Sequence, residues 1–155
     1  MVSEESAQEI FRHKQALDLD HLPGQVLHRD REMGQIRGRV KDFFEHVRPY
    51  NLLVFGETGT GKTLVTRYVG RELGAEGSSR ALKIRVVYVP CTHYPNEHEI
   101  IRAILGLLEG SPVQTGHYPS VYRDKLVEVA SGFDGLLIIL DDADRLLLQS
   151  SGAWL

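Results

Sequence analysis

The first half of the chain contains helical patterns and one short apolar run. Residues 6–20 predict a short helix, and a Pro-Gly pair at 23–24 begins a loop. Between residues 30 and 47, apolar residues recur at steps of three and four, as on one face of an amphipathic helix that ends before Pro49. The stripe consists of Met33, Ile36, Val40, Phe43, Phe44 and Val47. Residues 51–55 (NLLVF) are continuously apolar, which predicts a strand buried on both faces.

The second half of the chain alternates helical patterns with apolar runs. A glycine-rich loop at 56–61 leads into a helix from 62 to about 73. Residues 83–89 (KIRVVYV) predict a second strand, and residues 136–140 (LLIIL) predict a third. Two further helices are predicted at 97–108 and 120–129, separated by the break at 110–112. Because apolar strands alternate with helices, the sequence predicts the α/β class, with helices covering a mostly parallel sheet.

Composition narrows the class of protein further. A chain of 155 residues that is 42% hydrophobic and 25% charged has the size and composition of about one globular domain. The 18 Lys and Arg against 21 Asp and Glu give a net charge of −3, which excludes a strongly basic nucleic-acid coat. The N-terminus is acidic and polar, and the longest strongly apolar run falls far short of the ~20 residues that span a bilayer. We therefore expect an intracellular chain with no membrane partner.

A phosphate-binding motif follows the first predicted strand. Residues 56–63 (GETGTGKT) match the pattern G-x-x-x-x-G-K-[ST] at every fixed position. Glycines let a tight loop turn its backbone N–H groups toward phosphate, the lysine contacts the β- and γ-phosphates, and the final hydroxyl ligates Mg²⁺. The motif predicts a nucleotide site whose candidate residues are Thr58, Gly59, Thr60, Gly61, Lys62, Thr63 and Leu64.

Two acids follow the third predicted strand. Because parallel strands end at one edge of a sheet, Asp141 is expected on the same edge as the phosphate loop. There it could hold the water shell of the Mg²⁺ that Thr63 ligates, as the Walker-B aspartate does in P-loop enzymes. Asp142 is the candidate to orient or deprotonate the attacking water. A solvated acidic turn is the alternative for both residues, and it is weakened by the phosphate loop upstream.

These two motifs resemble those of the AAA+ ATPases, and their flanks resemble the origin-recognition and cell-division-cycle branch of replication initiators. The similar segments are Ile10-Phe11-Arg12, Leu27-His28-Arg29-Asp30-Arg31-Glu32, Val87-Tyr88-Val89-Pro90-Cys91 and Asp141-Asp142-Ala143-Asp144-Arg145-Leu146. The resemblance implies a three-layer P-loop sandwich that binds ATP or ADP with Mg²⁺. It also places the adenine against residues 26–29, with Val26, His28 and Arg29 as candidates.

The resemblance also sets expectations for domains and partners. Residues 1–49 would form a helical segment that contributes to the adenine pocket, and residues 50–155 a partial nucleotide-binding core. The family continues with another strand, a helical lid and a winged-helix DNA-binding domain, so the chain is expected to be the N-terminal portion of a larger ATPase. Partners would be double-stranded origin DNA and other AAA+ subunits or helicase-loading proteins. The location would be the nucleoid-associated cytoplasm or the nucleus.

Two departures from the family leave the activity open. The usual catalytic glutamate is replaced by Asp142, whose carboxylate is one methylene shorter. The strand that separates the two motif strands in the family has no counterpart, so residues 51–55 and 136–140 are not expected to be neighbours. We expect the chain alone to bind ATP and hardly hydrolyse it. The sequence leaves two alternatives to a replication initiator: a STAND-type regulatory NTPase and a non-catalytic remnant of an AAA+ protein.

Overall fold

The computed structural model describes residues 21–45, 51–144 and 146. Its elements in chain order are α2 (Asp30–Glu45), α3 (Lys62–Ser79), β1 (Ile84–Pro90), the 3-10 turn η2 (Cys91–His93), α4 (Glu97–Glu109), α5 (Pro119–Ala130) and β2 (Gly135–Asp141). The helix predicted at 6–20 lies outside the described residues. No helix in the described ranges is long and apolar enough to cross a membrane.

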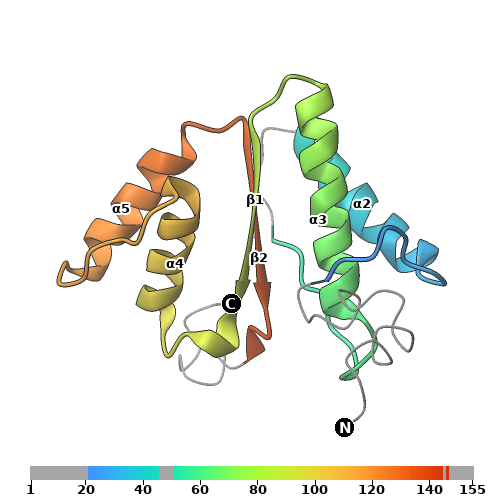
Figure 1. Ribbon diagram of the computed structural model, residues 1–155, viewed down its shortest axis with the longest axis horizontal. Helices are drawn as coiled ribbons and strands as arrows, with labels where there is room; N and C mark the ends of the chain where they lie inside the picture. Colours follow the sequence, from blue (N-terminus) through green and yellow to red (C-terminus); the bar gives the residue numbers. More distant parts are fainter. Residues whose placement is uncertain (1–20, 46–50, 145, 147–155) are drawn as a thin grey trace, which may run out of the picture.

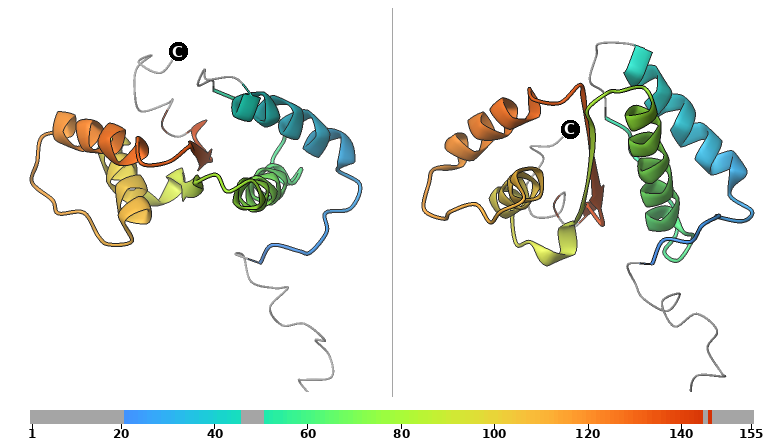
Figure 2. Two further views of the ribbon diagram at one scale, coloured as in Figure 1. Left: turned by 90° about the horizontal axis from the view of Figure 1, so that it is seen from above. Right: turned by 45° about the horizontal axis from the view of Figure 1, so that its top comes forward.

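The sheet consists of β1 and β2, which run parallel with Ile84 opposite Gly135 and Pro90 opposite Asp141. Helices cover both faces: α3 and then α2 lie on one side of the strands, and α4 and α5 lie on the other (Figures 1 and 2). This three-layer arrangement confirms the predicted α/β fold with a parallel sheet. Both strands end at the same edge, where the chain passes from β2 into Asp142.

Alternation along the strands divides the core between the two faces of the sheet. On the α4 side, Val87 and Val89 of β1 pack with Ile100 and Ile104 of α4. On the α3 side, Leu137 of β2 packs against a cluster that joins α3 to α2. The buried members of that cluster are Val26, Met33, Val40, Val65, Val69 and Leu73. The predicted stripe on α2 is therefore confirmed where its side chains are described.

The prediction of a strand over residues 51–55 is wrong. Residues 51–57 belong to neither a helix nor a strand. A strand requires a hydrogen-bonded neighbour, and β1 is the neighbour of β2 in the described sheet. Leu53 and Phe55 accordingly remain 76% and 85% exposed. The result agrees with the expectation that residues 51–55 and 136–140 are not adjacent.

Helix α3 extends to Ser79, six residues beyond its predicted end near 73. Gly74 and Gly77 lie in this extension, and glycine lowers helix propensity. In the structure α3 uses its glycines to approach the sheet. A Cβ on Gly70 would meet Ile139 Cδ1 at 2.9 Å, and a Cβ on Gly77 would meet Ile84 Cγ1 at 2.3 Å. Close packing on β1 and β2 thus overrides the local propensity.

We expect Gly77→Ala to destabilise the protein by about 1–2 kcal/mol, because overpacking against Ile84 exceeds the gain in helix propensity. Gly34→Ala on α2 is the matched control, since its Cβ would meet open space and should stabilise the protein by about 0.5–1 kcal/mol. Urea unfolding of both variants measures the difference. Equal or greater stability of Gly77→Ala would contradict the close approach of α3 to β1.

Candidate functional site

The glycine-rich loop leads directly into the first turn of α3. Gly59 and Gly61 have φ angles of 79° and 85°, in the left-handed region that favours glycine. Gly61 is the N-cap of α3 and has no side chain to cap it. The N-cap residue therefore offers no side-chain acceptor to the first backbone N–H groups of α3. Backbone N–H groups without such an acceptor at a helix N-terminus can bind phosphate. Thr60 closes the loop by donating from Oγ1 to the Glu57 carbonyl at 2.8 Å.

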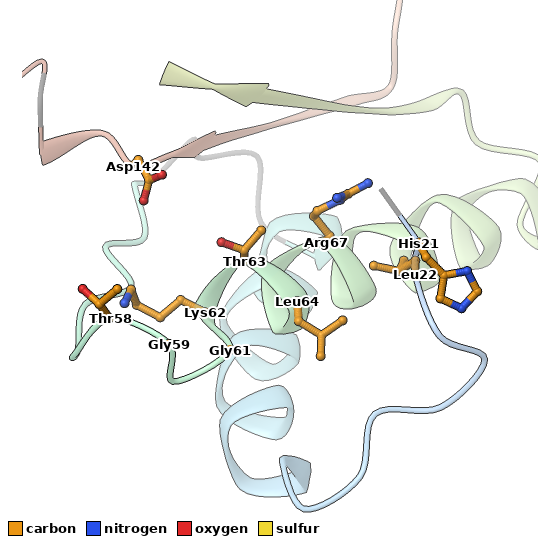
Figure 3. Close-up of a pocket in the computed structure, with 10 residues that line it drawn as sticks. All are labelled: His21, Leu22, Thr58, Gly59, Gly61, Lys62, Thr63, Leu64, Arg67 and Asp142. Atoms are coloured by element: carbon orange, nitrogen blue, oxygen red, sulfur yellow. The ribbon is translucent and has the colours of Figure 1, made fainter. Parts of the chain in front are cut away.

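Lys62 lies across this loop. Its Nζ donates to the carbonyl oxygens of Gly56 and Glu57 at 3.0 and 2.8 Å. Figure 3 shows the side chain extending from the start of α3 toward Thr58. The ammonium group is therefore held above the loop by two neutral acceptors. An incoming phosphate would offer a charged acceptor in their place, which forms a stronger hydrogen bond.

The two motifs meet at Thr63 and Asp141. Thr63 Oγ1 lies 3.0 and 2.8 Å from Asp141 Oδ1 and Oδ2, although the residues are 78 positions apart in sequence. Thr63 is in the first turn of α3, and Asp141 is the last residue of β2. A hydroxyl and a carboxylate are oxygen donors of the kind that Mg²⁺ prefers. The donor set at this edge of the sheet therefore fits the cation expected from the sequence.

Tyr88 is a member of this cluster that sequence reasoning did not assign. Its hydroxyl donates to Asp141 Oδ2 at 2.7 Å. Burial raises the pKa of Tyr88, and the adjacent Asp141 carboxylate raises it further, whereas the Arg67 guanidinium lowers it. The phenol therefore remains a protonated donor at neutral pH. Alternation of side chains along the strand could have predicted that Tyr88 faces α3. Its contact with Asp141 could not be predicted without the register of β1 against β2.

A hollow of about 380 Å³ adjoins the loop and the start of α3. Its lining includes the candidates Thr58, Gly59, Gly61, Lys62, Thr63, Leu64 and Asp142, together with His21, Leu22 and Arg67. Figure 3 shows Asp142 at the end of the sheet, across from Lys62 and Thr63, and His21 and Leu22 near the opposite end of the hollow. Asp142 has a φ of 52°, so its left-handed backbone turns the chain out of β2 at this point.

The residues predicted to face adenine do not line this hollow. Val26 is 5% exposed and packs in the cluster between α2 and α3. His28 is exposed and has a φ of 58°, and Arg29 pairs with Glu32 at 3.5 Å. His21 and Leu22 line the hollow on the side of the loop that precedes α2. Sequence reasoning missed them because a loop carries no periodic pattern that indicates which side chains face inward.

The comparisons with known proteins agree with the motifs. Residues 46–155 match a family model described as an AAA domain. The chain is 31% identical over 139 residues to an ORC1-type DNA replication protein 1 of Methanosarcina acetivorans, a match that covers 89% of this chain and 34% of the relative. It is 32% identical over 145 residues to ORC1-type DNA replication protein 8 of Halobacterium salinarum, covering 89% of this chain and 36% of the relative.

Solved structures show the same fold. The Aeropyrum pernix ORC1 protein in complex with DNA superposes with a TM-score of 0.71 at 30% identity, covering 83% of this chain and 34% of that one. The Aeropyrum pernix ORC2 protein, in ADPNP and ADP complexes, superposes with a TM-score of 0.73 at 19% identity over 89% of this chain and 36% of that one. The chain thus spans about a third of the length of these relatives.

Proposed function

Because the chain belongs to the AAA domain family, a family of nucleotide-binding ATPases, we propose that it is the ATP-binding module of an origin-type DNA replication initiator. The observation that carries the nucleotide part of the proposal is the contact between Thr63 and Asp141. That contact joins the phosphate-loop motif to the carboxylate motif at one edge of the sheet. The similarity to ORC1-type replication proteins over most of this chain supports the initiator part.

The phosphates of ATP or ADP would lie on the loop formed by residues 56–61, against the N–H groups of the first turn of α3. Lys62 would exchange its two loop carbonyls for oxygens of the β- and γ-phosphates. Thr63 and Asp141 would hold Mg²⁺, directly and through water respectively. When bound, that ion neutralises charge on the phosphates.

Asp142 is proposed to orient the water that attacks the γ-phosphate. Asp142 lines the same hollow as Lys62 and Thr63, which supports this role. Its carboxylate is one methylene shorter than the glutamate usual in the resembled family, and errors of ~1 Å are costly in catalysis. We therefore propose slow hydrolysis and a nucleotide that acts mainly as a conformational switch.

The base and ribose would occupy the part of the hollow near His21 and Leu22. Arg29 lies near the loop, since its Nε is 3.9 Å from the position of a Cβ on Gly61. His28 and Arg29 remain candidates for contacts with the bound nucleotide. Val26 would support this region from the core, because it is buried against α3 and α2.

Nucleotide titration tests this proposal directly. A fluorescent ATP analogue should bind saturably to the 155-residue chain in the presence of Mg²⁺, and unlabelled ATP and ADP should displace it. GTP serves as the comparison that measures base selectivity. The absence of saturable, ATP-displaceable binding to folded protein would contradict the proposal.

The initiator role is tested with the full-length protein. We propose that its nucleotide state changes its assembly with other AAA+ subunits on double-stranded origin DNA, and that it acts where cellular DNA is located. Binding to origin DNA measured with ATP, with ADP and without nucleotide should differ. Identical DNA affinity and stoichiometry in all three states would contradict the switch.

A further inference from the structure

We propose that Tyr88 is a positioning residue that fixes the Asp141 carboxylate for Mg²⁺, an inference that rests on the proposed nucleotide site. Tyr88 Oη donates to Asp141 Oδ2 at 2.7 Å, and Thr63 Oγ1 approaches the same carboxylate at 2.8 and 3.0 Å. Two hydroxyls from different elements thus hold one side chain. The carboxylate is constrained from β1 on one side and from α3 on the other.

The strand register explains why position 88 reaches Asp141. Tyr88 lies opposite Ile139, and Asp141 lies opposite Pro90, two residues further along both strands. Side chains separated by two residues share a face of a sheet, so Tyr88 and Asp141 both project toward α3. The long phenol side chain spans the diagonal between them. A shorter hydroxyl residue at position 88 would not cover the same distance.

The ring of Tyr88 is itself held in place. The Arg67 guanidinium carbon lies 4.7 Å from the ring centroid, and Arg67 is one helical turn after Thr63 on α3. The ring also lines a second hollow, of about 300 Å³, together with Val86 and Ile139. The contact with Arg67 limits the orientations of the ring and so of its hydroxyl, which is what a group that orients a metal ligand requires.

The Asp141 carboxylate keeps an acceptor position for the cation and its water shell. A carboxylate offers about four acceptor positions on two oxygens. Tyr88 and Thr63 both donate to Oδ2, and Thr63 Oγ1 also lies 3.0 Å from Oδ1. One position on Oδ1 therefore remains for the water shell of Mg²⁺. Without the Tyr88 hydroxyl, the Asp141 carboxylate would keep the contact with the Thr63 hydroxyl but lose the one from β1. The carboxylate could then rotate. The expected consequence is weaker coupling between Mg²⁺ and nucleotide binding.

Tyr88→Phe removes one oxygen atom and keeps the ring under Arg67. The measurement is the affinity of the fluorescent ATP analogue across a Mg²⁺ titration and in EDTA. We expect the Mg²⁺ concentration at half-maximal enhancement to rise by about 10-fold, the lower end of the effects seen for groups that orient metal ligands. Affinity in EDTA should stay unchanged, because the loop and Lys62 do not depend on Tyr88.

Tyr68→Phe is the matched control. Tyr68 is also covered by an arginine, with Arg71 at 4.7 Å from its ring, and its hydroxyl donates at 3.1 Å to the Gly24 carbonyl. Loss of that hydroxyl removes a comparable bond that does not involve Asp141. The Mg²⁺ dependence of Tyr68→Phe should match that of the wild-type chain.

Two outcomes would overturn the role of Tyr88. One is an unchanged Mg²⁺ dependence, and the other is an equal loss of affinity in Mg²⁺ and in EDTA, which indicates a general structural role. Repeating Tyr88→Phe in an Asp141→Ala background should produce no further change in Mg²⁺ dependence if the phenol acts through Asp141. Failure of the wild-type chain to bind the analogue would instead refute the proposed nucleotide site, so the two failures are distinguishable.

Discussion

Lys62→Ala should weaken binding of the Mg²⁺–ATP analogue by about 10- to 100-fold. The ammonium group supplies a charge-assisted contact to phosphate, worth about 1.5–3 kcal/mol. Lys62 must first leave the carbonyl oxygens of Gly56 and Glu57. These acceptors are neutral and lie in an exposed loop, so their loss costs less than the phosphate contact gains. The large net effect follows from exchanging neutral acceptors for a charged one.

Lys83→Ala is the matched control for this change. Lys83 is exposed and immediately precedes β1, at the end of the sheet opposite Asp141. Both substitutions remove one positive charge, so a general change in net charge would affect them equally. Titration of the ATP analogue into both variants distinguishes loss of a specific phosphate contact from a general charge effect, and circular dichroism verifies that both variants are folded. Equal affinity of Lys62→Ala and wild-type protein would refute the phosphate-loop interpretation.

The parts of the site that depend on local chemistry could be predicted from the sequence. The positive φ angles of Gly59 and Gly61 are conformations that the glycine spacing favours. The rule that parallel strands end at a common edge predicted that Asp141 lies beside the phosphate loop. Thr63 does contact Asp141, although residues 51–55, which precede the loop, form no strand. From the residues alone, a STAND-type NTPase remained a possible alternative. The similarity to ORC1-type replication proteins supports the initiator interpretation.

The parts that depend on distant neighbours could not be predicted in the same way. Residues 51–55 have the composition of a buried strand, but a strand is defined by its hydrogen-bonded partner. The length of α3 depends on the contact of Gly77 with Ile84, which local propensity does not contain. Tyr88 reaches Asp141 through the register of β1 against β2. In each case tertiary contacts decide the outcome that propensity leaves open.

Leu105→Ala should lower the free energy of unfolding by about 2–5 kcal/mol, the range for a leucine removed from a packed core. Leu105 is fully buried at 0% exposure on α4. It forms a cluster with Ile101 and Tyr122, against partly buried Val129 of α5. The cavity left by the substitution would lie between two helices, which limits how far the surroundings can collapse. Typical domains have only about 5–15 kcal/mol of stability, so this loss is severe.

Leu107→Ala on the same helix is the control, because Leu107 is 46% exposed and its truncation should change stability by only about 0.5 kcal/mol. Both variants are compared by urea unfolding with and without the ATP analogue. The α4–α5 layer covers the face of the sheet opposite α3 (Figure 1). Nucleotide at 100 times its Kd should therefore stabilise both variants by the same ~2.7 kcal/mol. A smaller gain for Leu105→Ala would contradict the independence of this layer from the phosphate loop, because separate sites should contribute additively.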